Sequence, residues 1–489
     1  MKCDPNNFTG SDLERIEAAI RASRGSGGTV RIPARRPDAA SKRDYWLLDA
    51  AIRIPSDTTL IIDSCRIKLS DNCRDNFIRS ANCGHGVADI PVVRNIRILG
   101  VGGATLEGAD DPRATGDSAK TLGTGIKQSY GSDAGKMGET QNGDWRNIGI
   151  LLVNVENFTL ENLTIRDSHA WAVSLEYCAH GRISNLNFIS SGSRKVNGKI
   201  VPVLNQDGLD LRRGCHDIDI DTIRGATGDD LVALTALAPR RDHAPGEYGF
   251  TEMSGSRKNM RENDVFAIRI SNVAGYCAGG HHIVRFLNSS GVRMYDIELE
   301  NLRDTSPAGF RCRAAVKIGD ANPAWGGVTP LGDTTRFRIS DICSRAHHAI
   351  LVAGSLTDSE ISNVTNLNHE TTDITLQSGP ENLRNVCIGG NAAWLAKAKK
   401  NPTGENGGCI DSECLARLHL LAQITPWQSS QLGSLVNPPL NADGLPRRKK
   451  IRQGKMAVVL IRNVWPGFIC WRRLRRGSLP RWVRLSIRR

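Results

Sequence analysis

Long apolar runs are what this sequence most clearly lacks. No uncharged apolar stretch is long enough to span a membrane, and residues 1–16 contain no apolar signal region. These absences predict a soluble protein without a transmembrane segment. It would be cytoplasmic as the chain stands, or secreted or periplasmic if a leader is missing from it.

A disulfide framework and a zinc site are also missing from the pattern of the 13 cysteines. Secreted disulfide scaffolds favour an even, clustered set, whereas this number is odd and the spacing is irregular. Cys409 and Cys414 lie near each other, but no second Cys/His pair completes a zinc site. We therefore expect a reduced protein with no metal or other cofactor.

Acidic residues are absent from 445–489, a segment with fifteen Lys and Arg residues. Removing these charges from the net charge of +13 leaves residues 1–444 near −2. The tail could bind nucleic acid or an anionic membrane, but the main body has no charge excess that predicts a nucleic-acid partner. We expect 396–489 to be an irregular extension, strongly basic from residue 445.

Aromatic residues are scarce, at 5%, whereas 39% of the chain is hydrophobic and 49 residues are glycine. This composition favours many short strands joined by tight turns over a helical bundle. One helix is predicted near the start, where Ser11 or Asp12 can cap it and Glu14 can complete a capping box. A strand at 29–33 follows at once, so the helix is suited to cover the open end of a solenoid.

A short motif of the form Ile-Ser-Asn-Leu then repeats, with shortest intervals of about 22 or 23 residues. This period predicts an all-β fold, a right-handed parallel β-helix, over residues 1–395. The recurring Asn is interpreted as a structural ladder of stacked amides. Polar insertions near 106–145, 191–201, 239–263 and 303–333 are expected to wall a groove. The copies of the motif are Leu160–Leu163, Ile183–Leu186, Ile220–Ile223, Ile270–Val273, Leu299–Leu302, Ile339–Ile342 and Ile361–Val364.

Three aspartates are predicted to converge on adjacent coils. Aligning Leu209 with Val232 places two segments one coil apart, so that Asp207 lies beside Asp230, about 4.8 Å away, with Asp229 at the adjacent position. Strict alternation would place Asp207 and Asp230 on the same face as the buried Leu209 and Val232, so we expect each strand to begin after its Asp, with Gly208 permitting a bend. Turn capping would explain a single Asp, but not three on neighbouring coils.

Like charges this close cannot all stay ionised, so at least one carboxyl pKa should rise. A protonated acid beside ionised carboxylates suits glycoside hydrolysis, in which one group protonates the leaving oxygen and another activates water or attacks carbon.

Two downstream segments are weaker candidates. The glycines of Gly279–His282 would let His281 and His282 approach a ligand, although an exposed His pair is more often incidental. Arg311, Arg313 and Lys317 share one alternation face and form a cationic row, which is surface charge unless it meets a carboxylated sugar.

Together these segments resemble glycoside hydrolase family 28, the polygalacturonases and rhamnogalacturonases, over roughly residues 10–390. Asn205–Asp210 is similar to the family's Asn-Thr-Asp-Gly-x-Asp, Gly228–Asp230 to its Gly-(Gln/Asp)-Asp-Asp, and Gly280–His281 to its Gly-His-Gly. The chain departs from the family at His282, which replaces the second Gly, and at Ala315, which replaces the Arg of Arg-Ile-Lys.

The resemblance implies an inverting, metal-independent hydrolase of a pectin-like poly- or oligosaccharide, acting as a monomer. Asp229 would be the general acid, Asp207 and Asp230 would activate water, and His281 would support the acid. The substrate would be bound by Lys317, Arg313, His282 and Asp210. The missing Arg weakens the case for galacturonate more than the case for hydrolysis.

Two other functions remain open. A polysaccharide lyase of the same fold would abstract a proton with Lys or Arg, beside calcium held by acids. A non-catalytic glycan-binding solenoid would use the same groove without turnover.

Overall fold

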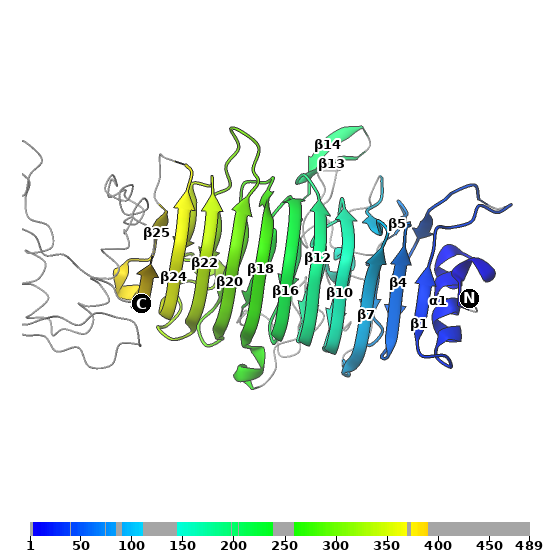
Figure 1. Cartoon of the computed structure of the whole chain (residues 1–489), viewed down its shortest axis with the longest axis horizontal. Coiled ribbons are helices and arrows are strands. Elements are labelled where there is room, and N and C mark those ends of the chain that lie inside the picture. Colours follow the sequence, from blue (N-terminus) through cyan, green and yellow to red (C-terminus); the bar gives the residue numbers. More distant parts are fainter. Residues whose placement is uncertain are drawn as a thin grey trace, which may run out of the picture. The chain divides into compact units, whose positions relative to one another are not determined.

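Parallel strands stacked in successive coils make up the protein (Figure 1). The computed structural model describes residues 3–39, 41–73, 75–84, 90–110, 144–196, 198–203, 205–237, 259–368 and 373–389. A sheet of 14 strands (sheet A) and one of 10 strands (sheet B) lie along the stack, and a two-stranded hairpin stands apart from both. From the fourth coil on, each coil gives one long strand to sheet A and then one short strand to sheet B. The fold is a right-handed parallel β-helix, as predicted.

Sheet A is visible at the front of Figure 1, with its strands all running in one direction. Its strands are β1 (Thr29–Ile32), β2 (Trp46–Leu48), β4 (Thr58–Asp63), β5 (Arg66–Leu69), β7 (Val93–Val101), β8 (Thr105–Glu107), β10 (Val155–Arg166), β12 (Ala179–Ile189), β16 (His216–Thr227), β18 (Val265–Cys277), β20 (Met294–Asp304), β22 (Thr334–Ser344), β24 (Leu356–Asn366) and β26 (Leu383–Gly389).

Sheet B lies on the opposite side of the core. Its strands are β3 (Ile52–Ile54), β6 (Ile78–Ser80), β9 (Ile150–Val153), β11 (Val173–Glu176), β15 (Leu209–Leu211), β17 (Val232–Ala236), β19 (His282–Asn288), β21 (Ala314–Ile318), β23 (His348–Val352) and β25 (Ile374–Leu376). The hairpin strands are β13 (Ser193–Val196) and β14 (Lys199–Pro202), and short 3₁₀ turns lie at η1 (Pro5–Asn7), η2 (Asp144–Asn147), η3 (Met260–Asn263), η4 (Pro323–Trp325) and η5 (Pro380–Asn382).

The core is built by registered columns of aliphatic side chains. On sheet B, Leu209, Val232, Val284, Val316 and Ile350 occupy one register position on consecutive strands, and all five are fully buried. Each strand of sheet B is only three to seven residues long, so the stacking of coils, and not strand length, supplies the buried area there.

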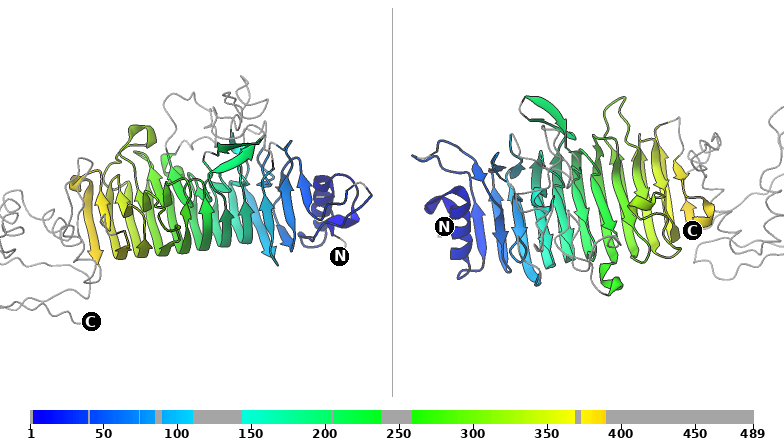
Figure 2. Two further views of the ribbon diagram at one scale, coloured as in Figure 1. Left: turned by 90° about the horizontal axis from the view of Figure 1, so that it is seen from above. Right: turned by 180° about the vertical axis from the view of Figure 1, so that it is seen from behind.

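The helix α1 (Asp12–Ser23) covers the N-terminal end of the stack, as predicted (Figure 2). Ser11 is its N-cap, and Ser11 and Glu14 form the reciprocal capping box. Ile16 and Ala19 are fully buried, so the helix shields the first coil from water.

The repeated Asn, replaced by Thr222 in β16 and by Asp341 in β22, marks a bend in the long strands of sheet A from β10 to β24. Asn162, Asn185, Asn272 and Asn301 all adopt left-handed φ angles between 51° and 60°, which Asn tolerates better than most residues. Side-chain hydrogen bonds join neighbouring coils, including Asn185 Nδ2 to Asn162 Oδ1 at 2.9 Å and Asn301 Nδ2 to Asn272 Oδ1 at 2.7 Å. The predicted structural ladder is confirmed at these coils.

The insertions differ from the prediction in detail. The one at 191–201 forms the β13–β14 hairpin, which projects from the stack (Figure 1). The one at 303–333 is divided by β21, because the run Ala314–Ile318 places Val316 and Ile318 in the core. Most of 106–145 and 239–263, the Cys409–Cys414 pair and the extension 396–489 lie outside the described residues, so the domain boundary near 395 stays a prediction.

The cysteines and the helices of the described residues bear on the predicted disulfide and membrane properties. Ten cysteines there are all unpaired thiols. Among the same residues, no helix has the length and apolar character needed to cross a bilayer.

Candidate active site

The three aspartates lie at the corner where the chain passes from sheet A to sheet B. Strands β15 and β17 begin at Leu209 and Val232, two residues after Asp207 and Asp230. The predicted bend is therefore present, and it frees both carboxylates from the inward column. The Gly208 N–H donates to the Asp230 carbonyl at 2.9 Å, which places the two corners on adjacent coils.

Glycines let these corners stack closely. A Cβ on Gly228 would lie 2.5 Å from the Gly192 Cα, and one on Gly279 would lie 2.0 Å from the Gly228 carbonyl oxygen. Neither position can hold a larger residue without moving the backbone. The close approach brings Asp229 and His281, each one or two residues beyond these glycines, onto the same corner.

The carboxylates of Asp207, Asp229 and Asp230 converge. One oxygen from each lies within 4.8 Å of one oxygen from each of the others. Asp230 is fully buried and Asp207 nearly so, whereas the Asp229 side chain is 22% exposed. Within the described part of the chain, Asp207 Oδ1 has no hydrogen-bond partner although it is buried. A buried, unpartnered carboxylate oxygen costs folding free energy, so this corner is a candidate site for a ligand.

Asp230 is held by three donors. His282 contributes its backbone N–H at 3.0 Å and its Nδ1 at 2.9 Å to Asp230 Oδ1, and Arg285 Nη1 donates to Asp230 Oδ2 at 3.1 Å. The His282 interaction fixes Nδ1 as the protonated nitrogen of a neutral ring, and Nε2 is buried without a partner among the described residues.

These contacts separate the pKa values of the carboxyl groups. Burial alone would raise the pKa of Asp230, but His282 and Arg285 bring it below the usual range for Asp. Burial also lowers the pKa of His282, so that ring is neutral near pH 7 and the permanent positive charge beside Asp230 belongs to Arg285. Asp230 is therefore ionised.

The pKa values of Asp207 and Asp229 are raised, in contrast to that of Asp230. Burial, followed by the charges of the other aspartates, raises the pKa of Asp207 well above its usual range. Burial and the charge of Asp230 raise the pKa of Asp229 to about 6. His281, which is exposed, has its Nδ1 3.9 Å from Asp229 Oδ1, too far for a hydrogen bond. The site thus holds a protonated and an ionised carboxyl group together near pH 6.

The groups around the aspartates change from acidic to basic along the stack. In one outward column, Asp210, Ala233, Arg285 and Lys317 are register partners on β15, β17, β19 and β21. Asp210 is buried with one unpartnered oxygen, and burial raises its pKa. The small side chain of Ala233 leaves space in which Arg285 can reach back to Asp230.

Arg285 is the site residue that the sequence analysis missed. It lies in the apolar strand β19, His282-Ile-Val-Arg-Phe-Leu-Asn288, where a lone charge has no local motif around it. The signal was its register: Val284 follows Val232 by one coil, so Arg285 must share a face with Asp210. The sequence spacing alone could therefore have shown that Arg285 lies on the same outward column as Asp210.

The predicted cationic row is only partly formed. Strand β21 begins at Ala314, so Arg311 and Arg313 precede it and do not alternate with Lys317 along one strand. The Arg313 N–H donates to the carbonyls of Gly280 and His281, which places this exposed residue one coil beyond His281. Lys317 is buried, and its ammonium group bonds Asp320 at 2.5 Å.

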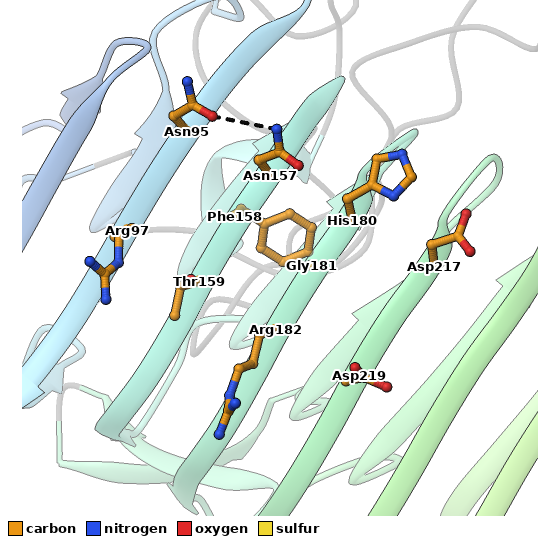
Figure 3. A pocket seen from close by; sticks show the side chains of 10 residues that line it. All are labelled: Asn95, Arg97, Asn157, Phe158, Thr159, His180, Gly181, Arg182, Asp217 and Asp219. Carbon is orange, nitrogen blue, oxygen red and sulfur yellow. Dashed lines mark hydrogen bonds between the residues drawn. The ribbon is translucent and has the colours of Figure 1, made fainter.

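A surface hollow lies elsewhere, on sheet A (Figure 3). Its polar side chains largely pair with each other or with neighbours: Arg182 Nε lies 3.1 Å from Glu161, and Asn157 Nδ2 donates to Asn95. Phe158, which Figure 3 shows beside Gly181, belongs to the core. None of the eight candidate residues predicted from the sequence lines this hollow.

Comparisons with known proteins identify only distant likenesses. No family model matches the chain, and no curated protein matches it in sequence. Among solved structures, an exopolygalacturonase of Thermotoga maritima is 13% identical with a TM-score of 0.41, over 79% of this chain and 91% of its own. The tailspike protein of Escherichia coli bacteriophage HK620 is 14% identical with a TM-score of 0.41, over 78% and 63%. The Streptococcus pneumoniae adhesin PfbA is 12% identical with a TM-score of 0.32, over 79% and 94%. At these scores the likenesses carry no inference about activity.

Proposed function

We propose that this protein is a glycoside hydrolase that cleaves an acidic, pectin-like poly- or oligosaccharide with Asp207, Asp229 and Asp230. The proposal rests on three carboxyl groups whose oxygens lie within 4.8 Å of one another, some protonated and one ionised near neutral pH. Asp229, the most exposed of the three, has a pKa raised to about 6, and Asp230 beside it stays ionised. An acid and a base held side by side near neutral pH are what glycoside hydrolysis requires.

In this mechanism Asp229 protonates the oxygen of the leaving sugar. Its partial exposure gives the substrate access to the proton, and its raised pKa keeps a useful fraction protonated up to about pH 6. His281, with its Nδ1 3.9 Å from Asp229, comes within reach of a hydrogen bond with a small movement once substrate is bound.

Asp230 accepts the proton of the attacking water. Arg285 and His282 keep it ionised and fix its orientation, so the base is present before substrate binds. Asp207 has a raised pKa and holds a proton in the free protein. Of the two bases that the family resemblance implies, Asp230 is thus the ionised one, and Asp207 is a hydrogen-bond donor to the water or the sugar.

The stereochemical outcome can be tested separately. Retaining glycosidases place their two carboxyl groups about 5–5.5 Å apart, and inverting ones about 6.5–9.5 Å apart to admit a water. The 4.8 Å limit between oxygens is closer to the first class, whereas the resemblance implies inversion. NMR of the first anomer released distinguishes these outcomes.

An acidic substrate is favoured by the cations beyond the carboxylates. Arg285 and Lys317 lie at one register position on β19 and β21, and Arg313 lies on the next coil after His281. The family motif Arg-Ile-Lys has Ala315 here in place of its Arg. Arg285, beside Lys317 in the register, would supply the positive charge that this Arg provides in the family. A sugar carboxylate above β19–β21 would meet Arg313 and Arg285 and not the aspartates of β15–β17.

A lyase that uses bound calcium is the second candidate, since one oxygen from each of three aspartates lies within 4.8 Å of the others. Calcium takes six to eight oxygen ligands, and Arg285 already occupies one oxygen of Asp230. This competition favours the hydrolase.

The test is an assay on a panel of galacturonate and rhamnogalacturonan oligosaccharides with and without a chelator. The hydrolase produces new reducing ends without ultraviolet absorbance, and chelation leaves the rate unchanged. Unsaturated, absorbing products that disappear with the chelator would establish the lyase. Binding without either product would establish a glycan-binding protein.

A further inference from the structure

Trp325 is the largest exposed apolar side chain in the described part of the chain. It is 47% exposed, and two other apolar residues of the same loop, Val328 and Leu331, are 37% and 41% exposed. Most tryptophans in proteins are largely buried, because an indole in water costs more than other exposed side chains. The described part of this chain buries Trp46, Trp145 and Trp171.

The loop that carries Trp325 is held in place at both ends. Asp320 bonds Lys317 Nζ through one oxygen and accepts the Asn322 N–H at 2.8 Å through the other. The Asn322 carbonyl then accepts the N–H of Trp325 at 2.9 Å, which closes the turn η4.

At the far end of the loop, Thr329 Oγ1 bonds Ser355 Oγ at 2.7 Å, and both side chains are buried. Gly326, at φ 96°, packs against the end of β19, where a Cβ would lie 3.0 Å from the Asn288 carbonyl oxygen. The indole therefore stands on a fixed turn, and little conformational entropy is lost when a ligand meets it.

Trp325 is connected directly to the carboxylate site. The Arg285 guanidinium lies 5.6 Å from the centre of its ring, and the same guanidinium donates to Asp230 at 3.1 Å. One arginine thus separates the exposed indole from the proposed base. Lys317, buried and paired with Asp320, holds the turn that presents the indole, so its part in this loop is to position Trp325.

We propose that Trp325 is a stacking platform for one pyranose ring of the substrate, at a subsite on the β19–β21 side of Asp229 and Asp230. The C–H groups of a sugar face pack against an indole, while the hydroxyl and carboxylate groups at the ring edge remain free to meet Arg285. The inference rests on the proposed function, because a bound saccharide chain must reach both the carboxylates and this ring.

The experiment compares Trp325→Ala, Trp325→Phe and Leu331→Ala, the last being a control of similar exposure in the same loop. We expect Trp325→Ala to raise KM for a galacturonate hexasaccharide about tenfold with kcat changed less than about threefold. Trp325→Phe should recover most of the loss, and Leu331→Ala should match the wild type. Equal KM values for Trp325→Ala and Leu331→Ala would overturn the platform while leaving hydrolysis intact.

Calorimetric binding in the Asp229→Asn background separates the platform from the chemistry. We expect Trp325→Ala to weaken binding of the same hexasaccharide about tenfold there as well. If the wild type binds but hydrolyses nothing, that loss still supports the platform and the proposed hydrolase fails. If the Asp229→Asn protein binds with and without Trp325 equally, the platform fails.

Discussion

The two sheets of this solenoid differ in how completely their polar side chains are paired. On sheet A, outward residues are paired: Asn side chains bond along the ladder, Phe266 stacks on Tyr295 with ring centres 5.0 Å apart, and Arg336 bonds Asp296 at 2.6 Å. On sheet B, buried atoms of Asp210, His282 and Arg285 have no partner among the described residues, whereas no described strand of sheet A carries such an atom.

This difference makes sheet B, where buried polar atoms lack partners, the candidate side for ligand binding. Repeating contacts on sheet A stabilise each coil against the next, as expected for a solenoid whose repeats are unstable alone. Sheet B gives up part of that stability, since buried charges and unpartnered atoms oppose folding. Active sites commonly carry such costs, and the three residues lie on β15 and β19, the strands on either side of β17, next to the aspartates.

The largest expected effect is on stability, from Arg285→Met. It leaves the fully buried Asp230 without its cation, so we expect the free energy of unfolding to fall by about 3–5 kcal/mol in urea titrations. The matched change on sheet A is Arg338→Met, which removes an exposed pair with Glu298 and should cost about 0–1 kcal/mol. Equal costs would erase the distinction between the sheets.

Activity should depend on pH through Asp229. Its pKa is raised to about 6, and the acid must be protonated to act, so kcat/KM should fall about tenfold per pH unit above pH 6. Asp230 has a lowered pKa and stays ionised through mildly acidic pH, so no loss is expected between about pH 4 and 6. A rate that rises through pH 7 would contradict this assignment.

The ladder of sheet A should matter for stability alone. Asn272→Ala removes the hydrogen bonds to Asp221 at 2.6 Å and from Asn301 at 2.7 Å, and it places Ala at φ 58°. We expect a loss of about 1–2 kcal/mol with unchanged kcat/KM. Asn272→Gly, which accepts that φ, is the control and should cost less. Loss of turnover without loss of stability would give the ladder a role that we do not assign to it.

The smallest expected effect has the opposite sign. Asp207→Asn removes a buried carboxyl group whose raised pKa means that the folded protein keeps a proton that the unfolded chain releases. That penalty is absent below the unfolded pKa and grows as pH rises, so the variant should gain about 2–4 °C in Tm at pH 7 and less at pH 4. On sheet A, the pKa of Asp221 is lowered, so Asp221→Asn should lower Tm at pH 7 and have less effect as the pH falls. Differential scanning calorimetry at both pH values checks the signs.

The fold was predictable because its contacts are local and repeated. A motif spaced by one coil specifies strand, bend and ladder together, and Asn162 and Asn185 are where that motif placed them. The pairing of Asp207 with Asp230 followed from the same spacing. The bend before each strand was an assumption from Gly208, and the structure confirms it.

The surroundings of the aspartates were harder to predict. Arg285 is a single charge in an apolar strand. Its part in the site is apparent only from its register with Asp210 and from its hydrogen bond to Asp230. Lys317 was predicted to bind substrate, but its partner Asp320 comes from the loop that follows. Side-chain reach and loop path are set by three-dimensional packing, which a spacing argument does not contain.

The most direct test of the carboxylate site is the turnover of Asp229→Asn beside that of Asp219→Asn, each on pectic oligosaccharides at pH 5. Asp219 is an exposed carboxylate of sheet A, with an ion pair to Arg269 at 3.6 Å. We predict that Asp229→Asn loses at least about 10³-fold in kcat with an unchanged circular dichroism spectrum, because the proton donor is gone, while Asp219→Asn keeps wild-type activity. Turnover retained by Asp229→Asn, or lost equally in both variants, would contradict the account.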